Sequence, residues 1–470
     1  MRENTSFRPP APVPQVEPLR PVSFLRTLWN NPIEAWTSGY FERPIVITRL
    51  PFGEVAVIND PGAIRRVLAD NRDNYPKDGF QKRMLAVLSN GLLTAEDAQW
   101  RMQRRALTPV LALRNVRTFV PTMLRAAGGL VERWRSHDGE VIDVADEVTE
   151  LTLAVLERTI FSDGIAGNRR ELRTAMRIYF DSLGRIDPFD LLNLPDFVPR
   201  VGRLRTRAAV RLFHQGIDEM ITSRGRPDVR ATGPQQDLLT LMLCARDPET
   251  GRRLSSAEIR ANVITFMSAG HESTANAIAW SLFLLSQSPA WRERLMAEAA
   301  RELDGPAETL LDRLVETRAV VEEALRLYPP LAAISRVARG SDELAATPIR
   351  RGAMVVIAPY VLHRHRLWWK EPELFNPARF LPPSRASIDR YVYMPFGGGP
   401  RACIGSVFAL QEAMIVVAAI IREFELEVAP GHVVWPLHRI TLRPRRGLPM
   451  IVRRRLCAHV KAPSSHGDAC

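Results

Sequence analysis

The chain has 470 residues, of which 46% are hydrophobic and 25% are charged, a composition typical of folded globular proteins and unlike that of disordered chains. Its 64 basic residues outnumber its 52 acidic residues and give a net charge of +12, which suits a nucleic acid, a membrane surface or an acidic protein as partner. The four cysteines form no Cys-x-x-Cys pair. This argues against a zinc ribbon, a thioredoxin-type site or a disulfide scaffold and favours a reducing compartment.

The two ends of the chain differ in composition from its centre. Residues 1–35 open polar and become rich in proline, so we expect an extended, largely unpacked arm. We expect residues 457–470 to form a flexible tail. No run of 18 consecutive apolar residues and no signal-peptide core occurs, which predicts a cytoplasmic protein without a transmembrane helix.

The first predicted elements after the arm are two short strands. Ile45–Thr48 and Glu54–Ile58 flank the turn sequence Pro-Phe-Gly, which indicates a β-hairpin. The pattern then becomes mostly helical, with breaks at Pro and Gly. Helices are predicted over residues 97–107, 116–136, 142–162, 169–183, 202–224 and 235–244.

The clearest predicted helix runs from Ser255 to Pro289. It begins with a capping-box pattern, because Glu258 follows the capping Ser255 by three residues. It is apolar on most sides, so we expect it to cross the middle of the protein.

The C-terminal third mixes helices, strands and loops. Its predicted elements are helices at 309–328 and 404–422, a buried strand Met354–Ala358, a loop-rich stretch over 361–403, and strands at Phe424–Val428 and Ile440–Val452. A length prior would suggest about three domains, but no linker divides the chain after the arm. The pattern therefore predicts one mainly α-helical domain with a minor β portion over residues 36–456.

The sharpest feature is a glycine-rich loop around a cysteine, Phe396-Gly-Gly-Gly-Pro-Arg401-Ala-Cys403-Ile-Gly405. Glycine lets a backbone turn tightly and pass close to a flat ligand. Cys403 lies at the start of a predicted helix, where amide donors and the helix dipole favour a thiolate. A thiolate held in this way is a good soft ligand for iron. A lone cysteine would more simply be a buried side chain beside a glycine turn, but the spacing of the whole loop favours the ligand.

The spacing Phe-x-x-Gly-x-Arg-x-Cys-x-Gly resembles the haem-binding signature of the cytochrome P450 monooxygenases of the soluble bacterial type. Ligation of haem by cysteine is a known property of that family. The resemblance implies a haem-enclosing fold with haem b as cofactor and Cys403 as the ligand of the iron. It also implies that Arg401 lies near a haem propionate and that Phe396 and Gly405 belong to the cofactor site.

Two further motifs resemble the haem-propionate contacts of that family. Trp100 and Arg104 lie one turn apart on an early predicted helix, so both side chains face one way, and Arg336 follows a later helix. Propionates are carboxylates, for which arginine is the natural donor. The resemblance implies that all three residues bind the cofactor.

A third motif is a charged pair on the predicted helix over 309–328. Glu323 and Arg326 are three residues apart and share a helix face. They resemble the family's Glu-x-x-Arg pair, which a downstream arginine, here Arg379, completes. The implied role is structural, a buried ion network that fixes the loop carrying Cys403.

The long helix carries a polar run at its centre, Ala269-Gly-His271-Glu272-Ser273-Thr274, and such a run is costly in an apolar helix. The hydroxyl of Ser273 can donate to the carbonyl of Ala269, four residues back, and bend the helix. The run resembles the family's oxygen-activation motif, which implies that Glu272, Ser273 and Thr274 are catalytic and deliver protons. The family most often has Thr where this chain has Ser273, a departure that bears on coupling efficiency. For His271, the substrate pocket and helix packing both remain open.

The resemblance implies a monooxygenase that inserts one oxygen atom from O2 into a hydrophobic small molecule, by hydroxylation or epoxidation. The expected pocket walls are mostly apolar and include residues 80–93 and 165–215. The individual candidates for the substrate pocket are Met267, Ala269, Leu331, Ile334 and Leu437.

Electrons are expected from separate partners, an acidic ferredoxin-type donor and its NAD(P)H reductase, since the sequence contains no recognisable flavin or iron–sulfur segment. Arg101 and Arg105 would suit docking of that donor. A peroxide-driven peroxygenase and a non-catalytic haem-binding sensor are the alternatives. Neither a peroxygenase nor a sensor needs the acid–alcohol pair Glu272–Ser273. We expect a monomer that binds no nucleic acid.

Overall fold

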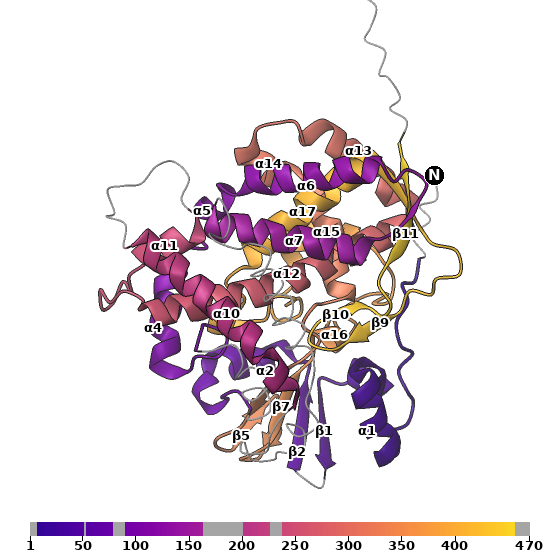
Figure 1. The fold of residues 1–470 in the computed structure, drawn as a ribbon. Coiled ribbons are helices and arrows are strands. Elements are labelled where there is room, and N and C mark those ends of the chain that lie inside the picture. The colour runs from indigo at the N-terminus through magenta and orange to yellow at the C-terminus, as the bar shows by residue number, and fades with distance from the viewer. Residues whose placement is uncertain (1–6, 51–52, 79–89, 163–200, 226–236, 456–470) are drawn as a thin grey trace, which may run out of the picture.

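The structure is a computed structural model that describes residues 7–50, 53–78, 90–162, 201–225 and 237–455. Helices make up most of the fold, and the sheet that contains β1, β2 and β7 lies below them in Figure 1. The mainly α-helical architecture with a minor β portion is therefore confirmed.

The helix α12 (Ser256–Ser286) passes through the middle of the helical layer. Its capping box is present: the Ser255 hydroxyl accepts a hydrogen bond from the backbone N–H of Glu258 at 3.2 Å, and the Glu258 carboxylate accepts one from the N–H of Ser255 at 2.9 Å. Most of its side chains are buried, and it packs against α7 (Val144–Phe161) and α17 (Ser406–Glu423). The prediction of a buried central helix is confirmed.

The larger sheet has the strand order β1-β2-β7-β4. Strands β1 (Ile45–Leu50) and β2 (Gly53–Ile58) are antiparallel, which confirms the predicted hairpin. Strand β2 runs parallel to β7 (Met354–Ile357), and β7 is antiparallel to β4 (Ile334–Val337). The sheet thereby joins the N-terminal part of the chain to β4, which carries two of the predicted site residues.

Two of the smaller sheets contain the last strands of the chain. Their strands are β3 (Val141–Asp143), β11 (Pro449–Arg454) and β8 (Phe424–Val428) in one sheet, and β9 (Pro436–His438) and β10 (Leu442–Pro444) in the other. The predicted strand region Ile440–Val452 is thus divided between two sheets. The backbone turns between β10 and β11 through Gly447, whose φ of 70° suits glycine.

The remaining described helices and strands are α1 (Pro21–Asn30), α2 (Pro61–Arg65), α4 (Asp97–Leu107), α5 (Leu113–Arg117), α6 (Val120–Arg135), α10 (Val201–Arg224), α11 (Leu238–Cys244), α13 (Pro289–Glu302), α14 (Leu310–Arg313), α15 (Val315–Leu327), α16 (Pro359–Leu362), β5 (Asp342–Leu344) and β6 (Thr347–Ile349). The predicted helix over 116–136 is split into α5 and α6. Proline is tolerated in the first turn of a helix and disfavoured in its interior. Because Pro121 lies in the first turn of α6, the new helix begins just before it. The predicted helix over 169–183 lies outside the described residues.

The N-terminal segment differs from the predicted unpacked arm. Residues 21–30 form α1, and the ring of Phe7 packs edge to face on Phe283 of α12, with centroids 6.2 Å apart. The Tyr328 hydroxyl donates to the carbonyl of Pro10 at 2.8 Å. The stretch from Phe7 to Pro10 is therefore anchored to the helical body, whereas α1 buries none of its side chains. The predicted tail over 457–470 lies outside the described residues.

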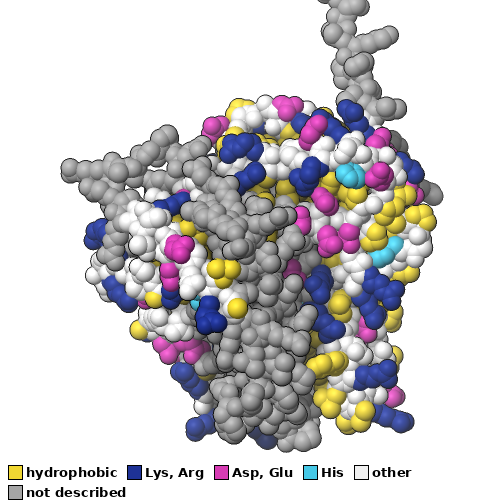
Figure 2. All heavy atoms as spheres, in the orientation of Figure 1, with side chains coloured by type: hydrophobic (Ala, Val, Ile, Leu, Met, Phe, Trp, Pro, Cys, Tyr) yellow, Lys and Arg dark blue, Asp and Glu magenta, His cyan; other side chains and the backbone are white. Residues whose placement is uncertain are grey.

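Figure 2 shows the distribution of charged side chains on one face of the molecule. On the face seen in Figure 2, Lys and Arg side chains lie scattered among acidic and apolar ones. The described residues of this face form no continuous basic stripe of the kind that tracks a nucleic-acid backbone. Among the described residues, no helix combines the length and apolar character needed to cross a membrane.

Candidate active site

A cavity of about 470 Å³ lies between the cysteine loop and α12. One wall is formed by residues 395–398 and 401–405 with the first half of α17, and another by residues 265–266 and 268–274 of α12. Most of the remaining lining is apolar. The cavity is large enough for a flat cofactor or a drug-sized ligand, and the predicted cysteine and the predicted polar run both line it.

The cysteine loop is held in a tight turn by its backbone. The N–H of Cys403 donates to the carbonyl of Phe396 at 2.8 Å, which closes the loop. Gly399 has a φ of 67°, and a Cβ at this position would collide with the backbone oxygen of Leu68. The loop consequently lies directly against the segment of Leu68, while the Cys403 side chain is open to the cavity.

The surroundings of Cys403 act on the pKa of its thiol in two directions. Burial raises the pKa of the Cys403 thiol, although the N–H of Gly405 and the charge of Arg104 act in the opposite direction. Helix α17 begins at Ser406, shortly after this residue. An iron ion bound at this sulfur would favour the thiolate, since a metal ion deprotonates a coordinating thiol.

Three arginines line the cavity beside this sulfur. Arg104 donates to the carbonyl of Ala402 at 2.9 Å. The Arg401 guanidinium lies 4.2 Å from the ring centroid of Trp100, and Trp100 lines the cavity too. Burial lowers the pKa of Arg104 and of Arg401, and burial together with the charge of Arg401 lowers the pKa of Arg336 to about 10.

The donor set fits haem. Within the described part of the chain, Arg104, Arg336 and Arg401 make no ion pair with an acidic side chain, so each remains available to an anionic group such as a propionate. Cys403 supplies a soft sulfur ligand on the same cavity. A macrocycle with two carboxylates and a central iron matches these donors.

The polar run of α12 faces the cavity from the other side. The Ser273 hydroxyl donates to the carbonyl of Ala269 at 2.6 Å, the bond expected from the sequence, and α12 stays helical through this point. Thr274 and Glu272 also line the cavity. His271 does so as well, while its Nδ1 lies 2.8 Å from the carbonyl oxygen of Met267. His271 therefore belongs to the cavity wall and also to the packing of the helix.

The structure places three of the five predicted pocket residues at the cavity. Ala269, Leu331 and Ile334 line the cavity, but Met267 and Leu437 do not. Met267 is fully buried in the hydrophobic core, because its position on the helix turns it away from the loop.

Leu437 lies in β9, opposite Arg443 of β10. The turn that joins these strands places Ile440 and Thr441, rather than Leu437, at the cavity. The expected walls over residues 80–89 and 165–200 lie outside the described residues.

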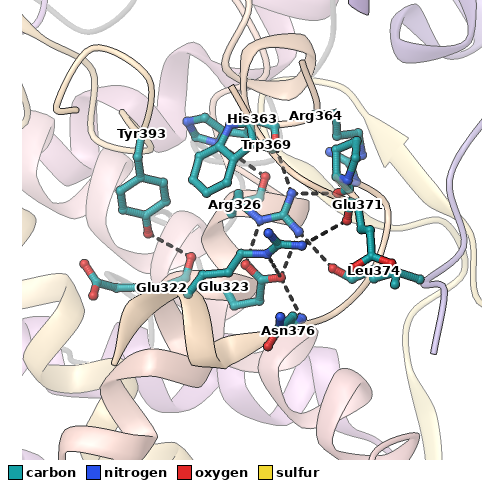
Figure 3. A network of polar contacts seen from close by, with 12 residues as sticks. Glu322, Glu323, Arg326, His363, Arg364, Trp369, Glu371, Leu374, Asn376 and Tyr393 are labelled. Atoms are coloured by element: carbon teal, nitrogen blue, oxygen red, sulfur yellow. Dashed lines mark hydrogen bonds and ion pairs between the residues drawn. The ribbon is translucent and has the colours of Figure 1, made fainter. Parts of the chain in front are cut away.

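A buried ion pair stands at the end of α15 (Figure 3). The Arg326 guanidinium donates to both oxygens of Glu323, at 2.6 and 2.8 Å, and the exposed fraction of both side chains is 0%. Arg326 also donates to the carbonyls of His363, Pro372 and Leu374 at 2.7–3.0 Å. A buried ion pair needs such additional partners to offset the loss of solvation.

Arg379 completes the predicted group, with its Nε 3.7 Å from an oxygen of Glu323 and its Nη2 donating to the carbonyl of Glu371 at 2.9 Å. The N–H of Asn376 donates to the same Glu323 oxygen at 2.8 Å. The three predicted residues are thus brought together, and they tie α15 to the segment that precedes the cysteine loop.

His363 links this group directly to the cysteine loop and is not among the predicted site residues. Burial lowers the pKa of His363 to about 3, and the nearby charge of Arg326 acts in the same direction. The ring is therefore neutral, and its Nδ1 lies 3.2 Å from the Arg326 carbonyl oxygen while its Nε2 accepts from the N–H of Met394 at 2.9 Å. Met394 lies two residues before Phe396, so the ion pair and the loop share one hydrogen-bonded path.

The comparisons with known proteins agree with this geometry. The family model described as Cytochrome P450 matches residues 25–448. Cyclooctatin synthase of Streptomyces melanosporofaciens is 33% identical over 396 residues, which is 83% of this chain and 84% of that protein. Pentalenene oxygenase of Streptomyces avermitilis is 31% identical over 392 residues, 82% of this chain and 85% of that protein.

Among solved structures, the crystal structure of the cytochrome P450DA haem domain superposes with a TM-score of 0.80 at 26% identity and covers 96% of this chain and 99% of that chain. The family match spans most of the sequence, and the fold agrees over nearly the whole chain. The chain belongs to the cytochrome P450 family and is a monooxygenase of that family.

Proposed function

We propose that this protein uses haem b to insert one oxygen atom from O2 into a hydrophobic small molecule, by hydroxylation or epoxidation, with electrons from separate redox partners. The observation that carries the proposal is the shared cavity, which has Cys403 on one wall and the run Glu272–Thr274 on the other. An otherwise apolar lining suits a hydrophobic substrate.

The residues of the chain hold and surround the cofactor. Cys403 would ligate the iron, and Arg104, Arg336 and Arg401 would bind the propionates, with Trp100 beside them. When bound, a thiolate-ligated haem supplies dioxygen binding and O–O cleavage. The apolar walls limit the access of water to the reacting centre.

Glu272 and Ser273 are proposed to deliver the protons that this chemistry consumes. The Ser273 hydroxyl donates to the carbonyl of Ala269. It must therefore rotate before it can donate a proton into the cavity, but its oxygen can accept a proton without rotating. Thr274 offers a second hydroxyl on the same wall. Positioned donors of this kind contribute about 10²–10⁴-fold to a reaction.

Replacing Ser273 with alanine is expected to lower the product formed per NADPH consumed by about tenfold and to divert the electrons to hydrogen peroxide. Ser273→Thr should keep the coupling, since it retains the hydroxyl. Ser281→Ala is the matched control, because Ser281 lies on α12, donates to the carbonyl four residues back at 2.7 Å, and is buried away from the cavity. If Ser273→Ala and Ser281→Ala couple equally well, Ser273 is not the proton donor.

The electron donor is proposed to be an acidic ferredoxin-type protein. Arg101 is exposed on α4, but Arg105 is already bound within the chain. It donates to the buried Asp247 at 2.6 and 2.7 Å and pairs with Glu249 at 3.0 Å. Arg105 is therefore a structural residue, which corrects its expected place in the docking face.

Binding of an acidic donor through exposed arginines is expected to weaken steeply as the salt concentration rises, since such contacts are screened by ions. Titration of the donor at increasing ionic strength measures this. An affinity that does not change with salt would contradict an electrostatic docking face.

The alternatives make different demands on the oxidant. A peroxygenase would form product from hydrogen peroxide alone, and a sensor would form none. We expect product with NADPH, ferredoxin and reductase and little with peroxide alone. The substrate can be sought from shifts of the haem absorption across terpenoids, steroids, fatty acids and aromatics. Pentalenene and cyclooctat-9-en-7-ol, which occur in the names of two relatives, belong in this panel.

A further inference from the structure

Thr441 contacts the carboxylate of Glu272 from outside the polar run of α12. Its hydroxyl donates to Oε1 of Glu272 at 2.6 Å and accepts from the side-chain amide of Asn276 at 3.1 Å. A hydroxyl carries one proton. The amide donor of Asn276 therefore directs that proton to Glu272.

The backbone that carries Thr441 is clamped to the body of the protein. The indole N–H of Trp280 donates to the carbonyl of Leu442 at 3.1 Å, and the N–H of Leu442 donates to the carbonyl of Pro330 at 3.0 Å. Asn276 and Trp280 both belong to α12. The position of the Thr441 hydroxyl is thus fixed relative to Glu272, as a positioning group requires.

Arg443 approaches the same carboxylate oxygen from the solvent side. Its Nη1 lies 3.8 Å from Oε1 of Glu272, and its side chain is 51% exposed, against 32% for Glu272. Both contacts fall on Oε1, and none of the described residues hydrogen-bonds Oε2. One oxygen of the carboxylate is held, and the other is left for proton transfer.

We propose that Thr441 is a positioning residue for the oxygenation reaction, which holds Glu272 through Oε1 so that Oε2 can carry protons from solvent beside Arg443 into the cavity. This inference rests on the proposed function, in which Glu272 delivers protons. Each proton that leaves Glu272 for the cavity is replaced by one from solvent water. Thr441 keeps its own proton throughout.

The test compares Thr441→Val with Thr441→Ser in the haem-loaded protein. We expect Thr441→Val to lower the product per NADPH by about tenfold, the equivalent of one hydrogen bond to a charged group, without raising the substrate KM. Thr441→Ser should restore the coupling because it retains the hydroxyl. Thr159→Val, which removes a buried hydroxyl on α7 that donates to a carbonyl within its own helix, is the control and should behave as the unmodified protein.

Two further measurements separate this inference from the proposed function. In a Glu272→Gln background, adding Thr441→Val should have no further effect, because the two residues act as a unit. The infrared stretch of carbon monoxide on the reduced haem should shift in Thr441→Val and in Glu272→Gln, and not in Thr159→Val.

One outcome would overturn the role of Thr441 alone. In it, Thr441→Val keeps the full product per NADPH and an unshifted carbon monoxide stretch, while Glu272→Gln loses product per NADPH. Full coupling in Glu272→Gln would overturn the proton route itself, and the role of Thr441 with it.

Discussion

Replacing Arg326 with alanine is expected to destabilise the protein by about 3–5 kcal/mol, because it leaves the carboxylate of Glu323 buried without its partner. Both side chains are fully buried, so water cannot replace the lost guanidinium. That loss is a large fraction of the 5–15 kcal/mol that typically stabilises a folded domain. Urea unfolding of the variant measures it directly, and the haem content of the purified variant should fall as well.

The chain contains a matched control on α6. Glu132 and Arg135 are also a Glu–Arg pair three residues apart, with a distance of 2.7 Å, but the Glu132 side chain is 72% exposed. Glu132→Ala is expected to change the free energy of unfolding by less than about 1 kcal/mol. Equal losses in Glu132→Ala and Arg326→Ala would contradict the special role of the buried pair.

Replacing Cys403 with serine is expected to abolish the thiolate-type absorption of the reduced carbon monoxide complex and, with it, the oxygenation activity. A serine hydroxyl is a hard and weakly acidic ligand, whereas iron in this family is held by a thiolate. The loop itself should survive, since the bond that closes it joins the backbone N–H of Cys403 to the carbonyl of Phe396.

Cys244→Ser provides the control for this experiment. Cys244 is a half-buried cysteine at the end of α11 and does not line the cavity. Its serine variant should keep the thiolate spectrum. An unchanged spectrum in Cys403→Ser would mean that another residue holds the iron.

The parts of the structure that sequence predicted well depend on local patterns. The capping box at Ser255 and Glu258 defines the start of α12, and both its hydrogen bonds are present. The spacing of Glu323 and Arg326 places them on one face of α15, where they pair. In each case, residues three apart on one helix contain the information.

The missed parts depend on contacts between distant segments. Thr441 reaches Glu272 only because the turn between β9 and β10 is packed on α12, 169 positions earlier in the chain. His363 joins Arg326 to Met394 through one neutral ring, an arrangement without a motif of its own. No periodicity or local spacing encodes such contacts, so tertiary packing had to supply them.

Two residues were misplaced for related reasons. Met267 belongs to the run expected at the cavity, but successive residues of a helix point about 100° apart, and Met267 faces the core. Arg105 is expected at an open docking face, yet Asp247 arrives beside it from a distant loop. Charge and hydrophobicity alone do not reveal which neighbour a side chain will meet.

The central claim is that the cavity between Cys403 and Glu272 supports the insertion of one oxygen atom from O2. The most direct measurement is a turnover under isotopically heavy dioxygen, with NADPH, ferredoxin, reductase and a substrate chosen from the spectral panel. We predict that the product carries one heavy oxygen atom and that none enters from heavy water. A product whose added oxygen comes from water, or one that forms only with peroxide, would contradict the claim.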